Sequence, residues 1–204
     1  MHDLYIYTLT VFMGFLAIMN PIANTPIFLG LVEGEDKASK KKIAGTATIA
    51  AFIIVTVFVI AGKYIFDLFG ITIPAFKITG GILIFYVGFE MLMSKKSKIH
   101  STGHPEESND VAISPLAIPI LAGPGTIVTA MNNVTDVSFV HIGIVIAVFA
   151  LMIYLTYLAF TFSDLLVSKL GTNVILVIGK LMGLILAIIG TGMVTEGIQM
   201  SFKF

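Results

Sequence analysis

Hydrophobic residues occur in six long runs, and polar residues gather in the short stretches between them. In chain order the runs cover Tyr5–Val32, Ile43–Phe69, Pro74–Met93, Val111–Val134, Phe139–Phe162 and Asn173–Gly197. A helix needs about 20 apolar residues to cross a hydrocarbon core of about 30 Å, and the runs are of that length or longer. The pattern therefore predicts an all-α integral membrane protein with six transmembrane helices.

Composition agrees with this pattern. Of the 204 residues, 57% are hydrophobic and only 12% are charged, and the mean hydropathy is +1.00, which is far too apolar for a soluble domain of this length. We therefore expect one membrane domain, residues 1–204, with the lipid bilayer as its surroundings. The 12 basic residues, all lysine, balance 12 acidic ones, so no basic excess points to nucleic acid. The absence of cysteine excludes disulfides and thiolate metal sites.

The first run is interrupted in its middle by the stretch Asn20-Pro-Ile-Ala-Asn-Thr-Pro26. Proline lacks a backbone N–H and clashes with the preceding turn, and it pushes the residue before it out of helical geometry. Inside hydrocarbon, irregular backbone survives only where protein buries it or a wet cavity borders it. The stretch therefore predicts a helix broken near the bilayer midplane, and a candidate site.

The fourth run is interrupted in a similar way. It contains Pro115, Pro119 and the tripeptide Gly123-Pro124-Gly125, so it cannot form one regular helix. We expect a second broken helix here.

A shift of 103 residues relates the two halves of the chain. It carries Pro21 onto Pro124, the central prolines of the two breaks, and also carries Lys77 onto Lys180. Because each half holds three predicted helices, an odd number, the second half must enter the membrane from the opposite side. The prediction is an inverted repeat, with repeat one at residues 1–94, a linker at 95–110 and repeat two at 111–204.

The lysines predict the orientation. If the helices alternate in direction, the first, third and fifth loops share one face, and eight of the lysines fall on that face against two on the other. The positive-inside rule places the lysine-rich loops, the linker included, in the cytoplasm. Both termini of this inner-membrane protein would then lie outside.

Inverted repeats with matched broken helices are typical of secondary transporters. The N-terminus of a half-helix carries unpaired N–H groups and about half a positive charge, which suits a carboxylate at mid-membrane. The candidate substrate-binding residues are those of the two breaks: Asn20, Pro21, Ala23, Asn24, Thr25, Gly123, Pro124, Gly125 and Thr126. The alternative is that these side chains only satisfy carbonyls freed by proline.

Three ionisable residues lie within predicted helices and are candidates for coupling or gating: Lys77, Lys180 and Glu90. Charged groups inside membranes are functional candidates by default, although a lysine near a helix end can also extend its amine to the interface. His100 and His104 have the spacing of metal ligands but lie in the hydrophilic linker. We assign no metal site and no prosthetic group.

Three stretches resemble the MarC family of integral membrane proteins. They are Met19–Phe28, the segment Ile73-Pro-Ala-Phe-Lys77-Ile-Thr-Gly80-Gly81-Ile-Leu, and the segment from Pro115 to Ile127. The resemblance extends over essentially the whole chain. One departure is that Lys77 and Lys180 stand where the family pattern has arginine, which would replace a bidentate contact with a point charge.

The resemblance implies six membrane helices, no cofactor, and transport of glycine, alanine and serine-like substrates driven by a proton or sodium gradient. We therefore predict a secondary transporter of small neutral amino acids and not an enzyme, because no nucleophile, base and orienting group share a membrane depth. The alternatives are a passive small-solute channel, an exporter of another small metabolite and a packing subunit of a larger complex. The sequence leaves a homo-oligomer open.

Overall fold

The computed structural model describes residues 2–93, 112–134 and 138–202, and this part of the chain is helical with no strand. The predicted linker at 95–110 lies outside the described residues. The elements are α1 (His2–Met19), α2 (Pro21–Leu31), α3 (Lys37–Phe69), α4 (Ile73–Met93), the π-helix η1 (Ala112–Leu121), α6 (Pro124–Val134), α7 (Phe139–Thr161) and α8 (Ser163–Phe202).

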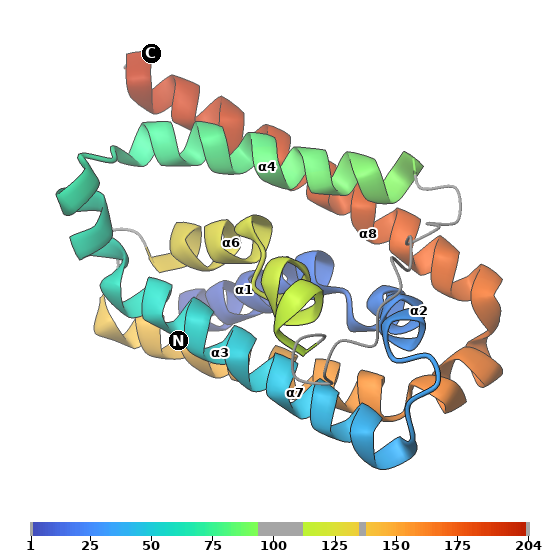
Figure 1. The fold of residues 1–204 in the computed structure, drawn as a ribbon. Coiled ribbons are helices and arrows are strands. Elements are labelled where there is room, and N and C mark those ends of the chain that lie inside the picture. Colours follow the sequence, from blue (N-terminus) through green and yellow to red (C-terminus); the bar gives the residue numbers. More distant parts are fainter. Residues whose placement is uncertain (1, 94–111, 135–137, 203–204) are drawn as a thin grey trace.

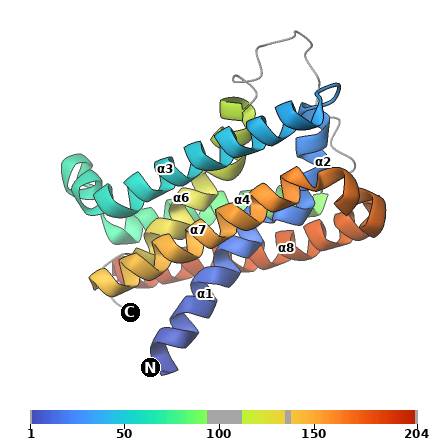
Figure 2. The ribbon, with the colours of Figure 1, turned by 90° about the horizontal axis from the view of Figure 1, so that it is seen from below.

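The helices form three layers. Figure 1 shows α4 and α8 side by side along one edge, α3 and α7 along the opposite edge, and the shorter segments α1, α2, η1 and α6 between them. Figure 2, seen from below, shows α3 and α7 in front of the central segments. The broken helices therefore form the interior layer, where the long helices cover their interrupted backbone.

The prediction of six crossings is met in part. In the described residues five helical stretches are long and apolar enough to cross a membrane: Leu4–Leu31, Lys37–Gly62, Ile73–Met93, Phe139–Thr161 and Ser163–Phe202. The fourth predicted crossing is divided into η1, of 10 residues, and α6, of 11 residues. Each piece is about 16 Å long or shorter, roughly half of a hydrocarbon core, so neither crosses alone.

Contacts between the elements follow a paired scheme. The second helix of the first half, α3, packs on η1 and α6, and its counterpart in the second half, α7, packs on α1 and α2. Similarly, α4 packs on α6, and α8 packs on α2. Each long helix thus contacts the broken helix of the other half.

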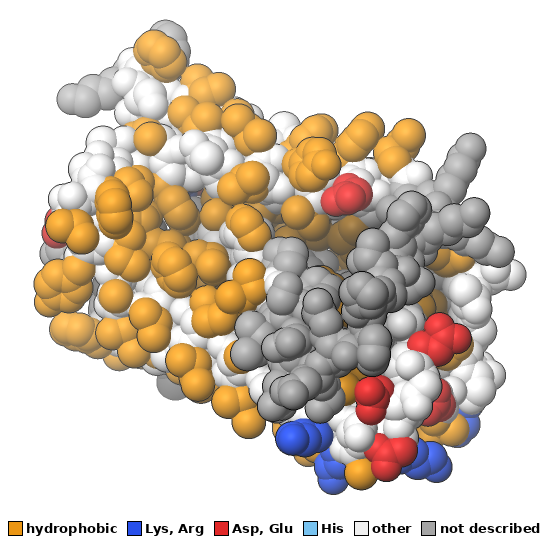
Figure 3. Space-filling view, in the orientation of Figure 1, with side chains coloured by type: hydrophobic (Ala, Val, Ile, Leu, Met, Phe, Trp, Pro, Cys, Tyr) orange, Lys and Arg blue, Asp and Glu red, His pale blue; other side chains and the backbone are white. Residues whose placement is uncertain are grey.

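The charged end of the molecule is where α3 begins. Figure 3 shows acidic and basic side chains gathered at that end, and mostly hydrophobic side chains over the rest of the visible face. Asp36 caps α3 by accepting a hydrogen bond from the Ser39 backbone N–H at 2.8 Å. Hydrogen bonds from the Ser39 side chain and backbone hold the pKa of the Asp36 carboxyl below its ordinary value. Lys40 lies 3.8 Å from Asp164, which places the first and fifth loops at the same end.

The stretch between the fifth and sixth hydrophobic runs, residues 163–172, is not the short link that the hydropathy pattern predicts. Residues 163–170 are helical, after a break from α7 at Phe162, and the next interruption is at Gly171, where φ is 74° and ψ is 152°. Glycine tolerates this positive φ because it has no Cβ. The sequence suggested a link because its polar residues interrupt the apolar pattern, but Asp164 lies in the first turn of a helix, where the macrodipole favours an acidic side chain.

Glycines bring α4 and α8 into backbone contact. Gly81 faces Gly190 and Gly88 faces Gly183, so the helices run antiparallel with glycines seven residues apart on each. A Cβ added at Gly190 would lie 2.5 Å from the Gly81 carbonyl oxygen, and one added at Gly88 would lie 2.5 Å from the Gly183 carbonyl oxygen. Small residues permit such close approach of membrane helices, so this pair forms one rigid wall.

We expect Gly190→Ala to lower the free energy of unfolding by about 1–3 kcal/mol, since the new methyl group meets backbone atoms that cannot move aside. Gly192→Ala is the matched control, because nothing lies within 4 Å of a Cβ at Gly192. Alanine favours a helix over glycine by up to about 1 kcal/mol, so the control should be neutral or more stable. Thermal unfolding in detergent compares the two, and equal midpoints would contradict the close packing of α4 and α8.

Candidate functional site

The first break lies at Asn20, between α1 and α2. Asn20 has a left-handed backbone, with φ 34° and ψ 69°, and is the one described residue other than glycine with a positive φ. Its side-chain oxygen accepts a hydrogen bond from the Ala23 N–H at 3.2 Å, and its carbonyl accepts one from the Asn24 N–H at 3.1 Å. Asparagine suits this position because it tolerates the left-handed conformation and caps helices.

Side chains also satisfy carbonyl groups around this break. Asn24 donates from its side-chain nitrogen to the Met19 carbonyl at 2.6 Å, and the Thr25 hydroxyl donates to the Pro21 carbonyl at 2.9 Å. The predicted structural role of these two donors is therefore present. They keep the interrupted backbone hydrogen-bonded away from water.

One polar group at the first break has no partner. The side-chain nitrogen Nδ2 of Asn20 is buried and makes no hydrogen bond, and the whole residue is only 3% exposed. The orientation of the amide is fixed by its oxygen, which already accepts from Ala23. A buried donor without an acceptor costs about 1–3 kcal/mol, so this position is suited to a ligand that brings an acceptor.

The second break separates η1 from α6. The Ala122 N–H donates to the Ala117 carbonyl at 2.8 Å, which ends the π-helix, and the Ile127 N–H donates to the Gly123 carbonyl at 3.1 Å, which begins α6. The N–H groups of Gly125 and Thr126 precede that first bond, so the helix supplies no acceptor for them. Both residues are buried, and their N–H groups form the positive end of a helix dipole.

The fold brings the two breaks together. A Cβ added at Gly125 would lie 2.8 Å from Cδ1 of Ile18, a residue two positions before Asn20, and 4.0 Å from Cγ1 of Ile84 in α4. On the other side of the first break, Ala23 lies against Gly179 of α8. Gly125 of the second break therefore lies against the helical turn that leads into the first break, and both Gly125 and Asn20 are buried. Pro124 is exposed, unlike its repeat counterpart Pro21.

The three predicted ionisable candidates lie apart from this region. The side chain of Lys77 in α4 is 12% exposed and forms an ion pair with Glu196 of α8 at 2.5 Å, so it is neither an isolated buried charge nor an amine extended to water. Lys180 and Glu90 are exposed. In the described residues no group of three histidine, cysteine or acidic side chains could hold a metal ion, and His100 and His104 lie outside those residues.

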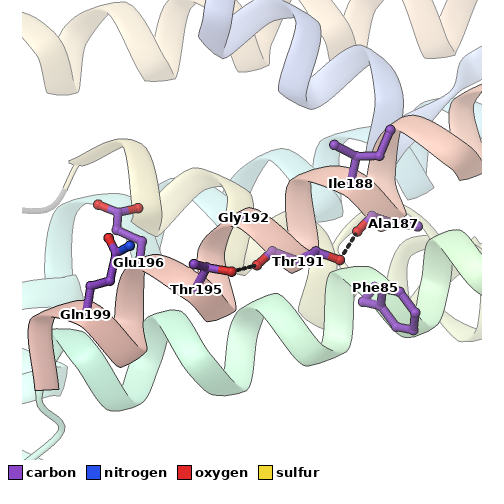
Figure 4. A pocket seen from close by; sticks show the side chains of 8 residues that line it. All are labelled: Phe85, Ala187, Ile188, Thr191, Gly192, Thr195, Glu196 and Gln199. Atoms are coloured by element: carbon purple, nitrogen blue, oxygen red, sulfur yellow. Dashed lines mark hydrogen bonds between the residues drawn. The ribbon is translucent and has the colours of Figure 1, made fainter. Parts of the chain in front are cut away.

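A surface groove lies on α8, and sequence reasoning missed it. It has a volume of about 590 Å³ and is lined by Phe85, Ala187, Ile188, Thr191, Gly192, Thr195, Glu196 and Gln199. Figure 4 shows the Thr191 and Thr195 hydroxyls hydrogen-bonded to carbonyls of their own helix, at Ala187 and Thr191. None of the predicted substrate-binding residues lines this groove. The threonine and glutamine spacing along one helix face was the available signal.

Layered apolar helices around two interrupted ones define an all-helical, multi-pass integral membrane protein. The comparison with protein families agrees: residues 5–202 match the model of the MarC family of integral membrane proteins. The chain belongs to the MarC family, as its three motif stretches indicated. It is a membrane protein, and its family is not named for any enzyme activity.

Relatives match over nearly the full length. The UPF0056 membrane protein YvbG of Bacillus subtilis is 41% identical over 205 residues, which cover 98% of this chain and 97% of that protein. The UPF0056 membrane protein PH0760 of Pyrococcus horikoshii is 37% identical, covering 93% and 92%. The UPF0056 inner membrane protein MarC of Escherichia coli is 29% identical, covering 90% of each chain. No solved structure matches this chain.

The geometry of the first break generates a stability prediction. Asn20→Ala removes the capping amide and leaves a Cβ at a positive φ without a compensating hydrogen bond, so we expect a loss of about 1–3 kcal/mol in the free energy of unfolding. Asn20→Gly should lose less, because glycine adopts this conformation without strain. Asn173→Ala, at an exposed position, is the control. Thermal unfolding in detergent ranks them, and equal losses for Ala and Gly would contradict a role for the left-handed backbone.

Proposed function

We propose that this protein is a secondary transporter of small neutral amino acids of the glycine, alanine and serine class, working by alternating access. The observation that carries the proposal is the unpaired, buried Nδ2 of Asn20 in the same region as Gly125, whose own N–H begins a half-helix. Donors without acceptors, gathered from two halves of a membrane protein, suit a small anionic group.

The substrate carboxylate is bound by three donors in this proposal. The Gly125 and Thr126 N–H groups contribute the dipole of α6, and Asn20 contributes its Nδ2. The amide groups that follow Pro21 are less suited than expected, because the Ala23 and Asn24 N–H groups already donate to Asn20. In this proposal the backbone N–H groups that bind the carboxylate therefore belong to α6 and not to α2.

The substrate ammonium group needs oxygen acceptors, and Asn24 and Thr126 supply them. The nitrogen of the Asn24 amide donates to Met19, which leaves its oxygen as an acceptor. Ile18 and Ile84, which border Gly125, would face the substrate side chain. Two apolar side chains and no charged residue at this position favour a hydrogen, a methyl or a hydroxymethyl group.

Burial of the region favours a gated transporter over a passive channel. Asn20 is 3% exposed, Thr25 is 0% exposed and Thr126 is 2% exposed. A solute can reach such residues only after helices move, whereas a channel needs a continuous opening. Moving one half against the other is the usual means in proteins built from inverted repeats.

We also propose that the two halves are inverted repeats of three helices each. The paired packing of α3 and α7 on the broken helix of the opposite half supports this arrangement, and so does the common end of the first and fifth loops at Lys40 and Asp164. In the cell membrane the lysine-rich end then lies in the cytoplasm and both termini lie outside. A proton or sodium gradient drives transport.

Uptake of labelled alanine and glycine into proteoliposomes tests the function. We expect saturable uptake that unlabelled serine inhibits, and that an imposed proton or sodium gradient accelerates. Counterflow should be observed when the vesicles are preloaded with alanine. Unsaturable flux would support a passive channel instead, and no flux of any small amino acid under either gradient would overturn the proposal.

Two variants locate the site. Asn20→Asp keeps the capping oxygen but replaces the Nδ2 donor with negative charge. Alanine uptake should therefore fall at least 100-fold, about 3 kcal/mol of lost binding. Asn173→Asp makes the same change at an exposed position and should have no effect.

Gly125→Ala should reduce uptake at least tenfold by filling the space against Ile18. Gly143→Ala is its control, because nothing lies within 4 Å of that position.

A further inference from the structure

The two broken helices contact each other along one side of the breaks. Next to the breaks Gly125 of α6 lies against Ile18 of α1, and one to two turns farther on Gly14 lies against Thr129, with 3.4 Å between a Cβ added at Gly14 and Cγ2 of Thr129. At the far end the Tyr7 hydroxyl donates to the Asn133 carbonyl at 2.6 Å. The segments α1 and α6 are therefore antiparallel and packed over their length.

The outer end of this contact is closed by aromatic and polar side chains. The His141 ring of α7 meets the Tyr7 ring edge to face, with centroids 4.6 Å apart, and the hydroxyl of Ser138 lies 2.8 Å from Nδ1 of His141. Side chains of α1 and α6 and of the start of α7 therefore meet at this end of the contact.

The other side of the breaks lacks a comparable contact. Within the described residues α2 packs on α7 and α8, while η1 packs on α3, and no packing similar to that of α1 on α6 joins α2 to η1. The 103-residue shift relates α1 to η1 and α6 to α2. Two equivalent halves would have two equivalent contacts, but the structure has only one of them in the part of the chain that it describes.

We propose that the contact of α1 with α6 is a gate, and that the described structure is the transporter closed on the side of its N-terminus. This inference depends on the proposed function and adds to it the residues that open and close. In the opposite state α1 separates from α6, and α2 meets η1 through the residues that the shift predicts. Gly14 and Thr129 correspond to Ala117 and Pro26.

The atoms in contact differ between the α4 and α8 wall and the α1 and α6 gate, and the difference fits a fixed interface and a moving one. In the α4 and α8 wall, glycine positions face backbone atoms of the other helix, as at Gly88 and Gly183. In the gate, the nearest atoms to a Cβ at Gly14 or Gly125 belong to side chains, Thr129 Cγ2 for the first and Ile18 Cδ1 for the second. The gate can therefore separate by moving side chains and breaking one hydrogen bond, while the wall remains intact.

Cysteine pairs test the gate, because the chain has no native cysteine. A Cβ at Gly14 would lie 3.4 Å from Cγ2 of Thr129, an atom one bond beyond the Thr129 Cβ, so cysteines at the two positions are close enough to test for a disulfide, whose Cβ atoms are about 3.5–4.5 Å apart. Without substrate we expect rapid oxidation to a crosslink that lowers alanine uptake at least tenfold, with recovery after reduction. Each single-cysteine variant, oxidised in the same way, is the control. Undiminished uptake by the crosslinked protein would overturn the proposal.

The opposite state has its own pair, Pro26→Cys and Ala117→Cys. It should oxidise slowly in the resting protein and at least fivefold faster during counterflow. If the loss of Pro26 disturbs folding, the pair Ile22→Cys and Leu121→Cys, which the same shift derives from Gly125 and Ile18, replaces it. Failure of both pairs to crosslink in folded protein under every gradient would show that the exchange does not occur.

A hydrogen-bond variant tests whether the contact of Tyr7 with Asn133 favours the closed state. Tyr7→Phe removes the donor to Asn133, so in the Gly14 and Thr129 cysteine background it should slow crosslinking about fivefold. Tyr5→Phe, at an exposed tyrosine of the same helix, is the matched control. Equal rates in the two variants would contradict the gate.

The crosslinking assays separate this inference from the proposed function. Both cysteine pairs report helix contacts and need no transported substrate. Mutually exclusive crosslinks in a protein that transports no amino acid would support the gate and overturn the substrate assignment. Normal amino acid uptake by protein crosslinked between Gly14 and Thr129 positions would do the reverse.

Discussion

The requirement that every backbone N–H and C=O be hydrogen-bonded inside hydrocarbon determines how this chain is arranged. Proline at positions 21, 26 and 124 interrupts the helical ladder where no water is available to replace it. The chain responds locally, with Asn20 capping α2 and the Asn24 amide donating to the Met19 carbonyl. The overall arrangement also protects the breaks, because the interrupted segments lie between two layers of long helices.

Glycine lets two of the long helices, α4 and α8, approach each other closely. In α4 and α8 the contacts at Gly81 and Gly190 bring carbonyl oxygens within 2.6 Å of where a Cβ would stand. The ion pair of Lys77 with Glu196 joins the same two helices. The glycine contacts within this wall are with backbone atoms, whereas the contacts between α1 and α6 at Gly14 and Gly125 are with side-chain atoms.

Much of the fold could be read from the sequence, since proline and the apolar runs have direct physical consequences. The break at Asn20 and the division of the fourth run both follow from residues that cannot continue a helix. The pairing of distant residues could not be read in this way. Nothing in the apolar pattern places Gly125 against Ile18 or Lys77 beside Glu196, because many helix arrangements bury the same residues.

The same limitation explains two features that the apolar pattern did not predict: the helical start of α8 and the partners of its glycines. The polar residues at 163–170 resemble a loop in a hydropathy pattern, yet they form the first turns of α8. The seven-residue spacing of Gly183, Gly190 and Gly197 is present in the sequence, but the spacing alone does not tell which helix each glycine faces. Gly179 contacts Ala23 near the first break, and Gly183 contacts α4, so neighbouring glycines serve different interfaces.

The hydrogen bonds of individual side-chain atoms distinguish a structural role of the first break from a functional one. A purely structural role requires each polar atom to satisfy a backbone group, and the Asn24 nitrogen, the Thr25 hydroxyl and the Asn20 oxygen do so. The Asn20 nitrogen does not. Asparagine suits the left-handed cap. Glycine would adopt the same backbone and leave no buried donor unpaired. A purely structural role does not explain why Asn20 has a buried side-chain donor without an acceptor.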